Sequence, residues 1–133
     1  MIRIVVGREP IDVAAEMTRV EAGNSGAVAT FTGLVRSDDG VSTLELEHYP
    51  GATEAALADV AAVASIRWSL GAATIVHRVG AMQPGERIVF VATAAIHRAE
   101  ALEACTYLID RLKNGAPFWK RETSGGEPRW GAD

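Results

Sequence analysis

The chain has 133 residues, 48% of them hydrophobic and 23% charged, which is the composition of an ordinary globular protein. Its formal net charge of −4, from 13 Lys and Arg against 17 Asp and Glu, argues against general nucleic-acid binding, which favours a basic surface. No apolar run approaches the ~20 residues that a membrane span needs, and the N-terminus lacks the layout of a signal peptide. A cytoplasmic protein with one domain over residues 1–133 is therefore expected.

Helical spacing of apolar residues predicts three helices, over residues 10–22, 53–68 and 97–114. Alternating or β-branched runs predict strands over residues 2–6, 27–35, 43–49, 73–79, 87–94, 118–123 and 129–130. Pro10 is expected to open the first helix and Thr53 to cap the second. The Asp-Gly pair within residues 37–40 predicts a tight hairpin between the flanking strands.

The resulting order is β-α-β-β-α-β-β-α-β-β, in which hairpin signals outnumber parallel crossovers. This order predicts an α+β fold with a largely antiparallel sheet and about three helices. The glycine-rich patterns that bind nucleotide phosphates are absent from the sequence.

The sulfur and imidazole groups offer little for metal chemistry. The single cysteine, Cys105, excludes an internal disulfide and a multi-cysteine metal site. The three histidines lack the spacing of a catalytic zinc site, so no metal and no cofactor are predicted. Cys105 belongs to a predicted helical stripe with Leu102, which favours a core position. His48 shares an alternating face with Leu46 and is interpreted as a buried packing residue.

The segment from Lys113 to Glu122 holds the most suggestive side chains. Lys113 ends a predicted helix, and Lys120 follows seven residues later, beyond a Gly-Ala-Pro reversal that can bring both ammonium groups to one pocket. Neighbouring cations lower each other's pKa, so that one amine can act as a nucleophile or move a proton. Alternatively, Lys113 complements the negative helix end and Lys120 is a solvated strand residue. Spacing alone leaves both interpretations open.

Four other side chains suit an anion: Arg36, His97, Arg98 and Arg129. His97 and Arg98 begin a predicted helix, where free N–H groups and the positive end of the helix dipole suit a phosphate. Arginine adds a bidentate fork. Each of these residues can equally be an exposed surface group, and the residues alone do not separate the two roles.

Six stretches occur in order along the chain: FTGLVR (31–36), LELEHYPG (44–51), HRVG (77–80), PGE (84–86), HR (97–98) and LKNGAPFWKRE (112–122). Together they resemble the large, catalytic subunit of molybdopterin synthase, the MoaE family. The resemblance covers about residues 3–131. No single stretch is decisive, but six of them in register are highly specific.

The resemblance implies a fold of the α/β-hammerhead type and a sulfurtransferase activity. The family converts a cyclic pyranopterin monophosphate, precursor Z, into the dithiolene of molybdopterin. The sulfur arrives as a thiocarboxylate on the C-terminal Gly-Gly tail of a ubiquitin-like small subunit. Lys113 and Lys120 match the family's catalytic lysines, and a second set matches residues that bind the anionic end of the substrate: Arg36, His97, Arg98 and Arg129. The implied assembly is a homodimer of large subunits with a small subunit at each outer end.

The length of the last predicted helix constrains such a site. Arg98 and Lys113 are fifteen residues apart on that helix, so at ~1.5 Å per residue they stand ~22 Å apart. A small pterin cannot touch both ends. Either the helix is broken, or the pocket combines Lys113 of one subunit with Arg98 of its dimer mate. The shared site is the prediction.

Two other classes of function remain open on the residues alone. One is a non-catalytic scaffold that docks a ubiquitin-like tail. The other is a sensor of a small anion or nucleotide that uses the basic pocket without a protein partner. Retention of both lysines favours the enzyme.

Overall fold

The computed structural model describes residues 1–36, 41–124 and 127–132, with the backbone alone at residues 41–42 and from residue 120 onward. Within these ranges three helices and eight strands follow in order: β1 (Ile2–Gly7), α1 (Val13–Glu21), β2 (Ala27–Leu34), β3 (Val41–His48), α2 (Ala52–Arg67), β4 (Ala72–Arg78), β5 (Gly80–Met82), β6 (Arg87–Ala95), α3 (Arg98–Gly115), β7 (Phe118–Ser124) and β8 (Glu127–Ala132). The predicted α+β class with three helices is confirmed. The short strand β5 was not predicted, and the predicted turn at residues 37–40 lies outside the described residues.

The strands form two four-stranded sheets, in the orders β1-β4-β6-β2 and β5-β3-β7-β8. Only the β1–β4 pair is parallel among the described strand pairs; the others are antiparallel. The predicted hairpin between β2 and β3 is wrong, because these strands lie in different sheets. β2 pairs along its whole length with β6, and β3 pairs with β5 and β7. A local Asp-Gly signal predicts a change of direction but does not determine the partner of each strand.

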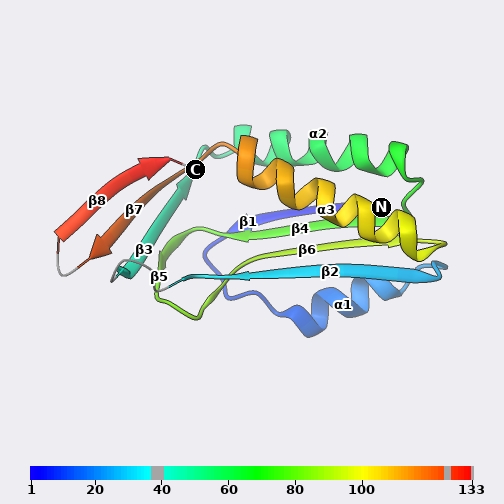
Figure 1. Ribbon diagram of the computed structural model, residues 1–133, viewed down its shortest axis with the longest axis horizontal. Coiled ribbons are helices and arrows are strands. Elements are labelled where there is room, and N and C mark those ends of the chain that lie inside the picture. Colours follow the sequence, from blue (N-terminus) through cyan, green and yellow to red (C-terminus); the bar gives the residue numbers. More distant parts are fainter. Residues whose placement is uncertain (37–40, 125–126, 133) are drawn as a thin grey trace.

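The first sheet is covered on both faces, as Figure 1 shows: α2 and α3 lie on one side and α1 on the other, while the second sheet sits at one end. Two core clusters fill these layers. Leu57, Ile75 and Leu108 belong to the cluster under α2 and α3, and Val20 and Phe90 to the one under α1. Since β4 and β6 are buried on both faces, their sequences are almost continuously apolar.

Two helix starts differ from the predictions. α1 begins after Asp12, whose carboxylate accepts a hydrogen bond from the Ala15 backbone N–H at 3.1 Å, so Pro10 precedes the helix. An aspartate is a strong N-cap and satisfies a free N–H that proline cannot. α2 starts after Gly51 (φ +86°), and the Glu54 carboxylate accepts a hydrogen bond from the Gly51 backbone N–H at 2.8 Å. Thr53 is therefore not the cap.

The buried face of α3 differs from the predicted one. Leu102 is 59% exposed, whereas the buried face consists of Ala101, Ala104, Cys105 and Leu108. Small alanine side chains let the helix lie close to the first sheet, so the contact surface runs through alanines and excludes the larger Leu102. The core position predicted for Cys105 is confirmed. Of the described helices, none has the length and apolar character to cross a bilayer.

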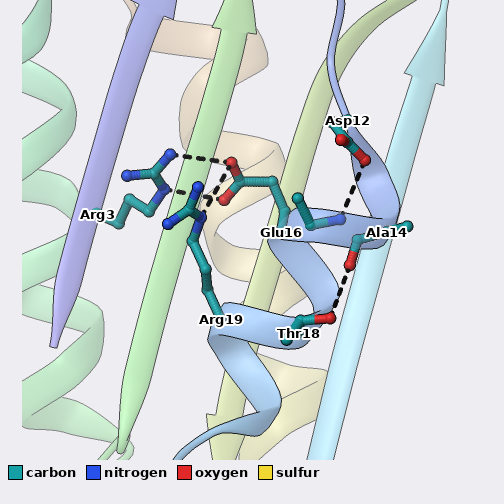
Figure 2. A network of polar contacts seen from close by, with 7 residues as sticks. Arg3, Asp12, Ala14, Glu16, Thr18 and Arg19 are labelled. Atoms are coloured by element: carbon teal, nitrogen blue, oxygen red, sulfur yellow. Dashed lines mark hydrogen bonds and ion pairs between the residues drawn. The ribbon is translucent and has the colours of Figure 1, made fainter.

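An ion-pair network ties α1 to the edge of the first sheet (Figure 2). Glu16 is buried, and its carboxylate accepts hydrogen bonds from Arg3 Nε at 2.9 Å and from a terminal guanidinium nitrogen of Arg3 at 3.0 Å. Arg19 Nε lies 3.9 Å from the same carboxylate. Because α1 is short, this bridge from β1 adds to its packing on the sheet and fixes its orientation.

Candidate functional site

The predicted site residues divide between the two ends of α3. This helix runs unbroken from Arg98 to Gly115, with His97 as its N-cap in extended backbone conformation and Lys113 in its last turn. The side chains of His97, Arg98 and Lys113 are exposed. At ~1.5 Å per residue the two ends are ~22 Å apart. Within one chain the structure therefore does not bring His97 and Arg98 to Lys113.

The lysine end of α3 leads directly into the second sheet. After Gly115 the chain is extended at Ala116, and β7 begins at Phe118. The backbone of Lys120 lies in the interior of that sheet, opposite Leu46 of β3 and Gly131 of β8.

Arg129 lies on β8, opposite Glu122 of β7. The structure thus puts the backbones of Lys120 and Arg129 on neighbouring strands. The side chains of Lys120 and Arg129 fall outside the described part, so their predicted contacts remain predictions.

Arg36 lies at the lysine end and not at the His97 end. β2 runs antiparallel to β6, with Ala27 opposite Ala95 near the start of α3, and Leu34 opposite Arg87 at the other end. In Figure 1 that second end of β2 faces the second sheet. Arg36 is exposed just beyond it. The register of β2 on β6 therefore places Arg36 with the proposed lysine half of the site and away from the half with His97 and Arg98.

The backbone before Arg36 is held by the turn that precedes β6. Val35 is buried; its N–H donates to the Glu86 carbonyl at 2.9 Å and its carbonyl accepts from the Gly85 N–H at 2.8 Å. The Glu86 carboxylate in turn accepts from the Gln83 N–H at 2.6 Å and from Arg78 at 3.0 Å. The hydrogen bond from Gln83, followed by the one from Arg78, lowers the pKa of Glu86. The sequence interpretation quoted this turn as part of the resemblance and did not assign it a role.

A cavity of about 420 Å³ opens beside this turn. Its charged lining residues are Arg78, Arg87 and Glu86, of which Arg78 and Glu86 form an ion pair, and Pro10, Ile11 and Leu34 contribute apolar walls. Arg87 donates to the Ile11 carbonyl at 3.1 Å, which holds its guanidinium at the cavity wall. The lining of this cavity therefore carries one positive charge in excess, that of Arg87, at the end of the molecule where Arg36 lies.

The remaining candidates have packing roles. Burial raises the pKa of the Cys105 thiol to about 11, despite an opposing hydrogen bond with Thr93, so the thiol stays protonated and unreactive near neutral pH. The His48 side chain is 14% exposed, with Nε2 3.5 Å from a Glu54 carboxylate oxygen and no hydrogen-bond partner for Nδ1 among the described residues, so it is half-buried and falls short of the core position predicted. His77 stacks on Phe118 at 4.2 Å between ring centroids. Among the described residues no group of three or more His, Cys, Asp or Glu is placed to hold a metal ion.

These features define a class: a small two-sheet α+β protein with exposed basic side chains at both ends of one helix. Residues 6–115 match the family model described as MoaE protein. The chain belongs to the MoaE family.

Relatives with established names are similar over most of the chain. The molybdopterin synthase catalytic subunit of Salmonella typhimurium is 49% identical over 132 residues, which covers 96% of this chain and 88% of that protein. The protein of the same name from Caulobacter vibrioides is 58% identical over 107 residues, 80% of this chain and 71% of the relative. The solved MoaE protein of Burkholderia ambifaria superposes with a TM-score of 0.89 at 45% identity, covering 99% of this chain and 90% of that one.

A more distant structure shares the fold. It is the complex of subunits 1 and 2 of molybdopterin-converting factor from Helicobacter pylori, in which the matching chain is 22% identical with a TM-score of 0.81. The match covers 97% of this chain and 88% of that one.

Proposed function

We propose that this chain is the catalytic subunit of a molybdopterin synthase and acts as a sulfurtransferase. It moves sulfur from the C-terminal thiocarboxylate of a ubiquitin-like small subunit to a cyclic pyranopterin monophosphate and forms the dithiolene of molybdopterin. The family match and the relatives named molybdopterin synthase catalytic subunit support this proposal. The cytoplasmic location expected from the sequence stays a prediction.

The observation that carries the proposal is the grouping of matched basic positions at one end of the molecule. Arg36 lies beyond the end of β2, Lys113 lies in the last turn of α3, and Lys120 lies on β7, into which α3 leads. Both reactants are anions, so a cationic site is needed even on a chain of net charge −4.

The proposed chemistry uses these cations to stabilise developing charge. Each transfer forms a bond between the carrier's sulfur and a pterin carbon while the bond from that carbon to oxygen breaks, and the departing oxygen takes up a proton. Water then hydrolyses the resulting thioester at the acyl carbon, so the sulfur stays on the pterin and the carrier leaves with an ordinary carboxylate. Negative charge develops on the acyl oxygen during this exchange, and fixed cations stabilise it. Three roles fit the amine of Lys113: it positions the acyl group, transfers a proton, or captures the carbonyl transiently.

We further propose that the working unit is a homodimer with shared sites. Since α3 is unbroken, one pterin cannot reach both Lys113 and Arg98 of the same chain. A second copy, related by a two-fold axis, can bring its own His97 and Arg98 to the lysine end of the first. Each dimer then holds two equivalent sites.

The small-subunit partner is proposed by analogy with the Helicobacter pylori complex, which contains two different subunits. A Gly-Gly tail is narrow and flexible, and it can enter a cavity that excludes the folded part of the carrier. Co-purification of a small ubiquitin-like protein with this chain would support the pairing and would exclude a sensor that acts alone.

The function is tested by reconstitution with precursor and thiocarboxylated small subunit, measuring dithiolene formation. The wild-type chain is expected to turn over, and Lys113→Ala to lose about 100-fold or more, the usual contribution of an acid–base or nucleophilic group. Lys113→Arg keeps the charge and separates positioning from proton transfer and capture. Arg67→Ala, which removes an exposed cation on α2, is the control and should keep full activity. Full activity in Lys113→Ala would reject the assignment, and a wild-type chain that binds the carrier without turnover would favour a scaffold.

A further inference from the structure

The two catalytic lysines proposed above are joined by a short reversal whose geometry must be maintained. Lys113 is in the last turn of α3, Ala116 is extended (φ −73°, ψ 135°), and β7 begins at Phe118. Lysine side chains are long and flexible, so the backbone sets where each amine can reach. Whatever holds the reversal therefore sets the distance between the two amines.

A buried hydroxyl from a remote part of the chain holds this reversal. Thr53, in the first turn of α2, has no exposed surface, and its Oγ1 donates to the Pro117 carbonyl at 2.7 Å. The same oxygen accepts a hydrogen bond from the Tyr49 backbone N–H at 2.9 Å. The hydroxyl thus uses its donor and one acceptor at once, and it links α2 to a residue 64 positions later. This replaces the capping role predicted for Thr53.

Packing holds the chain on the far side of Pro117. Phe118 is buried and stacks on His77, with ring centroids 4.2 Å apart and an interplanar angle of 25°. His77 Nδ1 lies 2.8 Å from the Arg78 carbonyl, which fixes the ring and assigns its proton to Nδ1. Phe118 also pairs with His48 in the second sheet. The start of β7 is therefore anchored. Of the two carbonyls between α3 and that anchor, Ala116 accepts from the Phe118 N–H at 2.9 Å, and Pro117 is held by the Thr53 hydroxyl.

We propose that Thr53 is a positioning residue for the lysine pair. Its hydroxyl fixes the entry into β7 and so keeps Lys113 and Lys120 at the separation that the transfer of sulfur requires. The proposal rests on the proposed function of this site. A misplacement of ~1 Å in a group that acts on bound reactants can lower a rate about 100-fold, although the group itself is still present.

The test compares three substitutions in the full chain, assayed with precursor and thiocarboxylated carrier. Thr53→Val keeps the shape and removes the hydroxyl, Thr53→Ser keeps the hydroxyl, and Thr53→Ala removes both hydroxyl and methyl. We expect Thr53→Val and Thr53→Ala to lower kcat by about 10- to 100-fold, with a KM for the carrier within about 3-fold of wild type. Thr53→Ser should retain kcat within about 3-fold.

A control separates positioning from general destabilisation. Val20→Ala removes buried apolar volume under α1, on the opposite face of the first sheet from α2 and α3, and should lower the urea midpoint without lowering kcat. A kcat of Thr53→Val equal to that of Val20→Ala would overturn the proposal. If Thr53→Val does not fold, the comparison of Ser with Ala decides, and equal kcat values for these two variants would overturn it as well.

Failure of the proposed function and failure of the positioning role give different experimental results. An inactive wild-type chain would reject the proposed function, and a fully active Lys113→Ala would reject the assignment of Lys113 as catalytic. An active wild-type chain with an inactive Lys113→Ala and an unimpaired Thr53→Val would reject only the positioning role.

Discussion

Removal of Arg3 should destabilise the protein, mainly because the buried carboxylate of Glu16 loses its charged partner. The Glu16 side chain is 9% exposed and the Arg3 side chain 33%. In Arg3→Ala the carboxylate keeps only Arg19, whose Nε is 3.9 Å away, in place of hydrogen bonds of 2.9 and 3.0 Å. Breaking a fully buried pair costs roughly 3–5 kcal/mol, and the partial exposure of Arg3 reduces the expected loss to about 2 kcal/mol.

The double substitution Arg3→Met with Glu16→Leu should recover most of that loss, because it removes the charge that needs a partner. We expect its free energy of unfolding to be within about 1 kcal/mol of wild type. Urea unfolding of Arg3→Met, Glu16→Leu and the double variant gives the coupling energy between the two residues by a double-mutant cycle.

The Arg8–Glu47 pair is a matched control. Its distances are similar, with one terminal nitrogen of Arg8 donating to both carboxylate oxygens at 2.9 and 3.2 Å, but the side chains are 65% and 26% exposed. Arg8→Ala should therefore cost less than about 1 kcal/mol. Equal losses for Arg3→Ala and Arg8→Ala, or a coupling energy near zero for Arg3 with Glu16, would refute the reasoning that burial decides the strength of the pair.

Three further outcomes are expected. Thr74→Val should raise the free energy of unfolding measured in urea by about 1 kcal/mol, because the buried Thr74 hydroxyl has no hydrogen-bond partner among the described residues. Thr93→Val should lower the free energy of unfolding, because the Thr93 hydroxyl donates to a backbone carbonyl at 2.6 Å. The hydrogen bond from Gln83 lowers the pKa of Glu86 in the folded protein, so the ionised carboxylate stabilises the native state at pH values above its unfolded pKa. This stabilisation is lost as the pH falls through the lower, folded pKa. When the free energy of unfolding is measured against pH, Glu86→Gln should therefore lack this acid-dependent loss of stability. Burial raises the pKa of Cys105 to about 11, so at pH 8 its thiol should react with a thiol reagent only after urea unfolding, and rapid reaction of the folded chain would contradict the assignment.

Local sequence patterns were sufficient for the helices and for most strands. Hydrophobic spacing predicted three helices, and β-branched runs predicted the strands of both sheets except β5, which has only three residues. Strand pairing was not predictable in this way, because the partner of β2 is β6, far along the chain. The buried face of α3 differs from the predicted stripe because helical spacing of large apolar residues does not include alanine: Leu102 is exposed, and Ala101 and Ala104 pack inward beside Cys105 and Leu108.

The candidate site was predictable only in part. The separation of Arg98 from Lys113 followed from the fixed rise of an α-helix, and the unbroken α3 confirms it. The placement of Arg36 with the lysines depends on the register of β2 on β6, which no local pattern encodes. The Thr53–Pro117 hydrogen bond joins residues 64 positions apart, and no local pattern predicts it.

A subunit-mixing experiment tests the shared site most directly. Lys113→Ala and Arg98→Ala are each expected to be inactive as homodimers, and the two are denatured together and refolded as a mixture. If each site takes Lys113 from one chain and Arg98 from the other, every mixed dimer has one intact site, and random pairing should restore about one quarter of wild-type dithiolene formation. If both residues serve the reaction within one chain, no mixed dimer has an intact site, and a mixture as inactive as its two components would contradict the account.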